Sequence, residues 1–338
     1  MLCTFLLAFG ATAQAANVSG SFTGAVNNNW SNTGNWTLYP EGTGTATIGD
    51  GNTVFLDSSQ SVGIVLLNSG AAAGNTTLNM TNGSNLTILK GSSESFGLSR
   101  VATGTGTVNH SAGTVLVGMG SGTAETRLVN VAGASSSYNL SGTATLDTEV
   151  LNRGAKDRAG DFNATGGTLV IRNLINKFGL ISETYGFDQG TCTLEVGAVD
   201  TVKAIGFGNS TNLMDYTVGS GGTMVFDITE SSLDTIVQYG NVANTLGAAL
   251  IIRTGGYTPG VDSFFDVWTG VDTDVTPDGF KNLVGSGAFA SITAGWTAGW
   301  VDTDGNLTTD TLRLTYVPEP ATIALFGLGL LALRRNKK

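Results

Sequence analysis

The stretch Leu78-Asn79-Met80-Thr81-Asn82-Gly83-Ser84-Asn85-Leu86-Thr87-Ile88 sets the pattern of the whole chain. An alternating apolar and polar segment meets a glycine, and a second alternating segment follows. Related stretches occur at 108–117, 138–146 and 162–171, with looser copies around Gly190 and Gly222, so that the shared glycines recur 23 to 32 residues apart. A repeat of this length, built from two short strands and a turn, is typical of a solenoid.

No single repeat can bury its apolar face, but stacked repeats bury it and pair their strand edges. We therefore expect an all-β fold, a right-handed parallel β-helix, with repeats over 66–230. The segment 16–65 is expected to cap the N-terminal end. The segment 231–316, with alternating strands near 250–253, 263–268 and 311–316, is expected to form a β-rich, membrane-proximal cap.

An asparagine recurs after an apolar residue in four repeats, at Asn79, Asn109, Asn139 and Asn163. Two interpretations are open. The side-chain amides stack as an internal ladder in which each satisfies the next, or each asparagine favours a local turn.

Two tryptophans, Trp30 and Trp36, lie among asparagines and glycines ahead of the first repeats. This segment resembles the start of autotransporter-like passenger repeats, which implies a packed cap. The alternative is a sugar-binding role, in which the exposed indole faces pack on pyranose rings.

The chain ends with Val317-Pro318-Glu319-Pro320, an apolar run over 321–333, and the basic residues Arg334, Arg335, Lys337 and Lys338. The prolines favour an extended tetrapeptide that a protease can recognise. The basic residues stop translocation and stay cytoplasmic. The alternative for this segment is a buried C-terminal helix, because a membrane span needs about 20 apolar residues.

This order of elements resembles the PEP-CTERM sorting signal of Gram-negative bacteria. The resemblance implies an exported protein with a short C-terminal transmembrane helix that anchors it transiently in the inner membrane over 317–338. It also implies processing by an exosortase and delivery to the cell surface, the outer membrane or the extracellular space.

The N-terminus agrees with export. Residues 2–11 form an apolar run, and Ala13 and Ala15 flank Gln14 as a small-x-small cleavage site, which predicts a signal peptide over 1–15. No Lys or Arg precedes the apolar run, which departs from the usual pattern and which a start codon placed too far downstream would explain.

Composition narrows the function classes. The chain has 49 glycines in 338 residues, 12% charged residues and a formal net charge of −10. An acidic exported surface argues against nucleic acid and anionic lipid as partners.

Cys3 lies in the signal peptide, so Cys192 has no intrachain partner and is expected to be a small buried residue. His110 is the one histidine, expected to point toward solvent from a strand, which makes a catalytic triad or a histidine-rich metal site improbable.

Carboxylates are the remaining chemical candidates. The densest charged cluster comprises Asp147, Glu149, Arg153, Lys156, Asp157, Arg158 and Asp161. Asp147 and Glu149 are two apart on a strand and so share a face, as a glycoside hydrolase or a polysaccharide lyase of the β-helix type requires. We favour a solvated loop between two repeats, because no matching acids recur near Gly113 or Gly190.

Asp302-Thr303-Asp304-Gly305-Asn306 and the Asp272–Asp274 pair are candidate calcium ligands, but the first departs from the EF-hand spacing and also fits a hairpin turn.

The sequence thus predicts a non-enzymatic, cofactor-free structural or adhesive protein of the cell surface or extracellular matrix. Exosortase is its processing partner, and an exopolysaccharide is a further candidate partner. A surface-displayed polysaccharide lyase or glycoside hydrolase is the alternative.

Overall fold

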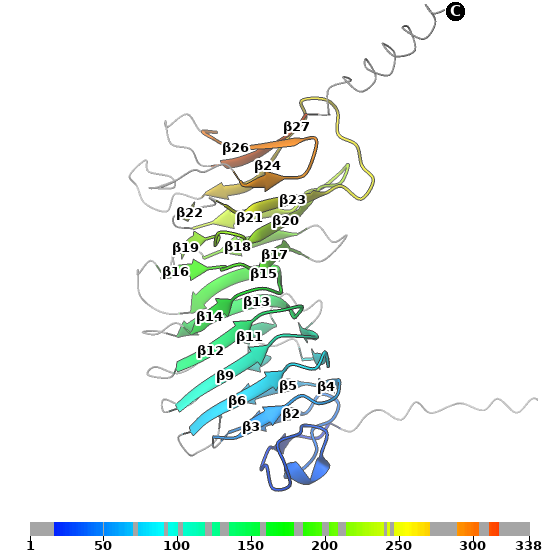
Figure 1. Ribbon diagram of the computed structural model, residues 1–338, viewed down its shortest axis with the longest axis vertical. Helices are drawn as coiled ribbons and strands as arrows, with labels where there is room; N and C mark the ends of the chain where they lie inside the picture. Colours follow the sequence, from blue (N-terminus) through cyan, green and yellow to red (C-terminus); the bar gives the residue numbers. More distant parts are fainter. Residues whose placement is uncertain are drawn as a thin grey trace, which may run out of the picture.

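The computed structural model describes residues 17–49, 51–69, 74–90, 94–100, 104–118, 124–128, 135–155, 160–178, 185–197, 203–208, 214–239, 242–243, 247–270, 289–303 and 311–317. Within them the chain is an all-β solenoid of about seven turns (Figure 1), and the one helical element is η1 (Thr33–Asn35). The predicted β-solenoid is therefore confirmed. Its right-handed path stays a prediction, and the expected C-terminal transmembrane helix lies outside the described residues.

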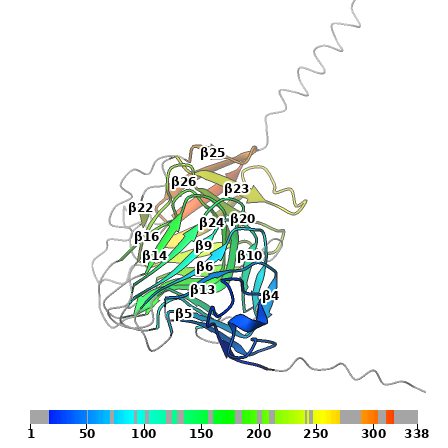
Figure 2. The same cartoon turned by 60° about the horizontal axis from the view of Figure 1, so that its bottom comes forward.

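Each turn contributes up to three strands, and equivalent strands stack into three parallel faces around the interior (Figure 2). The first face is built as two separate sheets. One holds β3 (Thr53–Phe55), β6 (Gly74–Met80), β9 (Gly104–His110), β12 (Ser135–Leu140) and β14 (Asp161–Ala164). The other holds β16 (Tyr185–Asp188), β19 (Met214–Thr217) and β22 (Val242–Ala243).

The second and third faces belong to one continuous sheet, which the two long strands β13 (Thr145–Ala155) and β15 (Thr168–Phe178) join by contributing to both. The second face adds β4 (Gln60–Val62), β7 (Leu86–Ile88), β10 (Thr114–Val117), β17 (Thr193–Val196), β20 (Thr223–Asp227), β23 (Ala249–Arg253) and β25 (Ser291–Ile292). The third adds β1 (Gly20–Ser21), β2 (Thr45–Ile48), β5 (Ile64–Leu67), β8 (Phe96–Gly97), β11 (Glu125–Arg127), β18 (Ala204–Phe207), β21 (Thr235–Gln238) and β24 (Phe264–Gly270).

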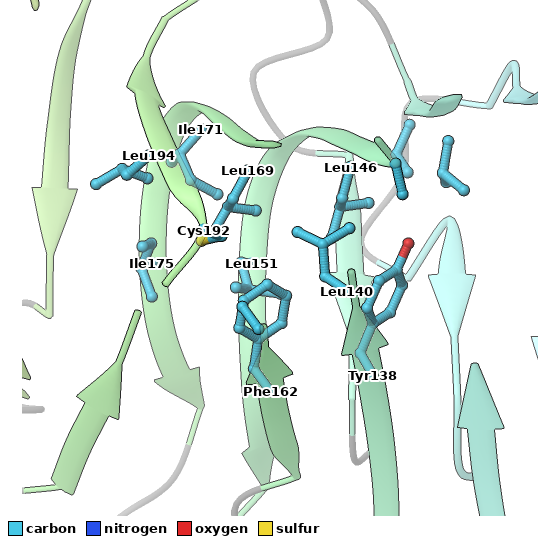
Figure 3. Packing of buried hydrophobic residues seen from close by; sticks show 14 of the residues in the cluster. Tyr138, Leu140, Leu146, Leu151, Phe162, Leu169, Ile171, Ile175, Cys192 and Leu194 are labelled. Atoms are coloured by element: carbon cyan, nitrogen blue, oxygen red, sulfur yellow. The ribbon is translucent and has the colours of Figure 1, made fainter. Parts of the chain in front are cut away.

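The interior consists of columns of apolar side chains that run from turn to turn. On the first face Leu78, Val108, Tyr138 and Phe162 are successive register partners, and all four are buried. Figure 3 shows Tyr138 and Phe162 beside leucines of the other faces; the two rings stack with centroids 5.9 Å apart. Burial of each such side chain contributes about 1.5–3 kcal/mol, so the alternating repeat supplies the core one turn at a time.

The glycines of the repeat make the corner between the first and second faces. Gly83, Gly113, Gly142, Gly167 and Gly190 all have φ between +59° and +82°, a backbone region that favours glycine. At the next turn, around Gly222, the left-handed glycine is the neighbouring residue. Gly221, with φ +86°, takes the left-handed conformation there, and Gly222 does not.

The parallel stack is longer than the predicted 66–230. It begins with the pairing of β1 to β2 and of β2 to β5, inside the segment expected to be a cap. It continues past Phe226, because β23 pairs with β20 and β24 pairs with β21. The strands predicted near 250–253 and 263–268 exist, but they form a further turn of the same solenoid.

At the C-terminal end the pairing changes direction. β24 and β26 (Trp296–Val301) both pair antiparallel with β27 (Thr311–Tyr316). Trp268 and Trp300 pack together there with ring centroids 5.7 Å apart. β26 and β27 are therefore the two strands of an antiparallel hairpin. The Asp304-Gly305-Asn306 turn expected between them lies outside the described residues.

At the N-terminal end Trp30 and Trp36 pack together with ring centroids 5.0 Å apart. Trp30 is fully buried and Trp36 is 6% exposed, so neither indole face is open to a sugar. The Trp36 Nε1 group donates a 2.9 Å hydrogen bond to the carbonyl of Trp30. The sugar-binding interpretation of this pair is wrong.

Two corner glycines give a matched test of the turn geometry. A Cβ at Gly83 would meet nothing within 4 Å, whereas a Cβ at Gly113 would lie 2.2 Å from the carbonyl oxygen of Ser84 in the preceding turn. We expect Gly83→Ala to cost about 1 kcal/mol of unfolding free energy, because of the left-handed backbone. Gly113→Ala should cost at least about 1 kcal/mol more, because of the clash. Urea denaturation followed by circular dichroism measures both, and equal losses would contradict the close contact between turns.

Candidate functional site

The outer side of the first face is a polar surface that β6, β9, β12 and β14 build together. Alternation places every second side chain outward, and parallel pairing aligns those side chains into columns. The outward residues are half-buried or exposed, and all except Asp161 carry hydroxyl or amide groups. The others are Asn75, Thr105 and Ser135; Thr77, Thr107 and Ser137; and Asn79, Asn109, Asn139 and Asn163. We call these ten residues the polar face.

The asparagine column is a ladder of side-chain hydrogen bonds. The Nδ2 group of Asn109 donates to Oδ1 of Asn79 at 2.8 Å, Asn139 donates to Asn109 at 2.8 Å, and Asn163 donates to Asn139 at 2.9 Å. Of the two interpretations of the sequence, the ladder is therefore confirmed. It lies on the outside of the solenoid, however, because the apolar neighbours of each asparagine occupy the interior.

Asn109 and Asn139 each use one N–H and one oxygen lone pair within the column, whereas Asn79 only accepts and Asn163 only donates. Each amide therefore keeps at least one further N–H and one further lone pair. These groups repeat at the strand spacing of about 4.8 Å. Phe55, the register partner of Asn79 in β3, is 42% exposed and places an aromatic ring at the start of the column. Asp161, the partner of Ser137, adds a carboxylate at the other end.

The charged cluster is on strands, and the prediction of a solvated loop was wrong for its first members. Asp147 and Glu149 lie on β13, and the register shifts between Thr148 and Val150. Asp147 accepts two hydrogen bonds of 2.6 Å from Arg172, and these bonds hold the pKa of the Arg172 guanidinium above its usual value. Glu149 is only 4% exposed.

The other cluster members contribute less to a site. The side chain of Arg153 and residues Lys156, Asp157 and Arg158 lie outside what the structure describes, and Asp161 lies on the first face.

Acids do recur between turns, which corrects the sequence analysis. Val170 is the register partner of both Asp147 and Glu195, so Glu195 lies two turns from Asp147 in the same column. Arg253 binds Glu195 at 2.7 Å and Asp227 at 2.6 Å. These four acids and two arginines form an ionic stripe, Asp147, Glu149, Arg172, Glu195, Asp227 and Arg253. Arginine bonds engage both carboxylate oxygens of Asp147 and of Asp227, and Oε1 of Glu195.

Asp234 connects two turns through backbone contacts. It is fully buried and accepts hydrogen bonds from the backbone N–H groups of Lys203 at 2.7 Å and Asp227 at 2.6 Å. Burial raises the pKa of Asp234 to about 7, and the nearby Asp227 carboxylate adds to the effect. Both oxygens are in use, so this side chain has a structural role.

His110 is buried, and the expectation that it faces solvent was wrong. Its Nδ1 atom lies 2.9 Å from the Tyr138 hydroxyl and its Nε2 atom 3.0 Å from the Gly113 carbonyl. Burial lowers the pKa of His110 to about 4. Cys192 is buried as predicted and lies among the apolar side chains of the interior (Figure 3). Its Sγ atom donates to the Gln189 carbonyl.

No group of three or more potential metal ligands occurs among the described residues. Asp302 is described and exposed, whereas Asp304 and the Asp272–Asp274 pair lie outside the described ranges.

The C-terminal segment decides where the protein goes. β27 ends at Tyr316, and Val317 follows with 42% of its surface exposed. A protein-family model described as the PEP-CTERM protein-sorting motif matches residues 317–338. The chain ends in a PEP-CTERM sorting motif. The motif indicates an exported protein that an exosortase processes, and that passes through a membrane to the cell surface or beyond.

The predicted recognition element Val317-Pro318-Glu319-Pro320 and the basic residues Arg334, Arg335, Lys337 and Lys338 all fall inside this match. Apart from Val317 they lie outside the described residues, as do Ala13 and Ala15 of the expected signal cleavage site. No helix in the described part of the chain is both long and apolar enough for a membrane span. Comparisons with curated proteins and with solved structures found no match.

The burial of His110 can be tested through the pH dependence of stability. An unfolded histidine takes up a proton near pH 6.5, whereas His110 in the fold does so only near pH 4. The unfolding free energy of the wild type, measured relative to that of His110→Gln, should therefore be largest above pH 6.5. This difference should fall by up to about 3 kcal/mol as the pH drops to 4. Denaturation curves of both proteins at pH 7, 5.5 and 4 give this difference. A difference that does not change with pH would show that His110 is solvated.

Proposed function

We propose that the solenoid is a structural or adhesive component of the cell surface or extracellular matrix, without catalytic activity, and that its polar face binds exopolysaccharide. In this proposal the 317–338 segment is a transient anchor in the inner membrane, where exosortase acts before the protein reaches its final location. The observation that carries the proposal is the combination of the sorting motif with the aligned amide and hydroxyl groups of the polar face.

The chemistry of the polar face suits a neutral glycan. Sugar hydroxyls both donate and accept hydrogen bonds, as do the remaining groups of the asparagine ladder and the hydroxyls of the Thr and Ser columns, where Thr105 and Ser135 bond each other at 2.9 Å. The exposed Phe55 ring adds an apolar surface for the C–H face of a pyranose. The paired state of Asp147, Glu195 and Asp227 supports a binding role over hydrolysis or elimination.

Binding to the polar face is testable with a matched pair of lysine variants. We expect the full chain to be retarded in gels that contain the exopolysaccharide of its host, and Thr107→Lys to lose most of this retardation because the long side chain covers the ladder. Thr87→Lys is the control, since Thr87 is half-buried on the outside of the second face. Equal retardation of both variants would exclude the polar face as the binding site. Release of sugar products from the polysaccharide, abolished by Asp147→Ala, would instead establish the enzymatic alternative.

Sorting is tested independently of binding. We expect the mature protein from its native host to lack the segment after Pro320, because the basic tail stalls export and leaves the tetrapeptide within reach of a membrane protease. Glu319→Ala should leave an uncleaved form in the inner-membrane fraction. Intact-mass analysis of each fraction measures this, and an unchanged mass and location would show that Glu319 is not part of the recognition element.

A further inference from the structure

Three exposed apolar side chains gather where the described fold ends. Val261 is 70% exposed, Phe264 59% and Val317 42%. We call these three residues the apolar tip. They belong to or adjoin β24 and β27, which lie at the opposite end of the stack from the N-terminal segment (Figure 1).

Backbone hydrogen bonds fix the apolar tip to the last strand. Residues 260–263 form a turn in which the N–H of Ser263 donates to the carbonyl of Gly260 at 3.1 Å, and Asp262 has φ +61°. This geometry places Val261 at the corner of the turn. The N–H of Asp262 donates to the Tyr316 carbonyl at 3.0 Å, and the N–H of Tyr316 donates to the Ser263 carbonyl at 2.9 Å. The turn is therefore held beside the residue that precedes Val317.

The charges around Phe264 are largely compensated. The Arg313 guanidinium lies 4.3 Å from the centre of the Phe264 ring, and it donates two hydrogen bonds, of 2.7 and 2.8 Å, to Asp266. Asp262 contributes an exposed carboxylate. Among the described residues the tip thus combines apolar side chains with the exposed Asp262 carboxylate, which suits a zwitterionic surface better than an anionic one.

The length of chain between the tip and the apolar run limits how far the tip can lie from lipid. Ala321, where the apolar run begins, is four residues beyond Val317. An extended chain spans about 3.3–3.6 Å per residue, so the two Cα atoms are at most about 14 Å apart. The headgroup layer of one leaflet is about 5–8 Å thick. Once residues 321–333 enter the hydrocarbon, the tip is within or just above the headgroups.

We propose that the apolar tip rests in the headgroup layer of the membrane that the C-terminal segment enters. Apolar side chains beside an anchored segment are stabilised at this depth. The contact stands the solenoid end-on and holds Pro318, Glu319 and Pro320 at the lipid surface, where a membrane protease reaches them. This inference rests on the proposed function, because it requires the 321–333 segment to be in the bilayer during sorting.

The test uses the full chain with Cys3→Ser and one introduced cysteine that carries the environment-sensitive NBD fluorophore. Cys192 is buried and does not compete for the label in the folded protein. The probe site is Val261→Cys. The control is Leu38→Cys. In the native protein Leu38 is 61% exposed, and it belongs to the N-terminal segment. Vesicles of phosphatidylcholine supply the lipid surface, and flotation reports whether the chain is bound to them.

We expect vesicles to shift the emission of the probe at 261 to the blue and raise its intensity, while the probe at 38 is unchanged. Adding Phe264→Ser should reduce the shift at 261 without changing flotation. A chain that floats with no shift at 261, or with equal shifts at both sites, would overturn the end-on contact but leave sorting intact. A chain that does not float would overturn both the contact and the transient anchor.

Discussion

The in-register parallel ladder between successive turns is the constraint on which the rest of the structure depends. Every strand leaves one edge of backbone N–H and C=O groups for the next turn. To pair with them, each turn must return in register, one strand spacing further along the axis. The corner glycines make this return possible on the first face. Once the register is set, identical positions of the repeat become columns, both inside the solenoid and on its surface.

The same constraint explains how buried polar atoms are satisfied. The hydroxyl of Tyr138 meets His110, the hydroxyl of Tyr216 donates to Gln189 at 2.6 Å, and the indole of Trp268 donates to Gln238 at 2.9 Å. In each case the partner lies one turn earlier, 27 to 30 residues back. An apolar column alone would tolerate sliding of one turn over another, whereas an unpaired buried hydroxyl costs about 1–3 kcal/mol. These pairs therefore specify the register.

The strand–glycine–strand pattern was enough to predict the solenoid and two of its three faces, because those strands alternate and the glycines mark their corner. The third face was missed. Its early strands, such as Phe96–Gly97 and Glu125–Arg127, are two or three residues long and share no residue type. The burial of His110 and the pairing of Asp147 with Arg172 also escaped prediction, since both depend on partners in another turn. The sorting motif was predictable because it is a contiguous signal that needs no fold.

The division of the first face into two sheets has a mechanical consequence. Between β14 and β16 the stack is joined through the second face, where β15 pairs with β17, and through the third, where β15 pairs with β18. Among the described strands, the other intervals from the turn of β3 to the turn of β22 are each joined by three ladders, whereas two ladders carry an axial load at this interval. Because each turn contacts only its neighbours, a solenoid opens at its weakest interface. Under a pull along the axis, the turns on either side of this seam are therefore expected to separate before the neighbouring turns that three ladders join.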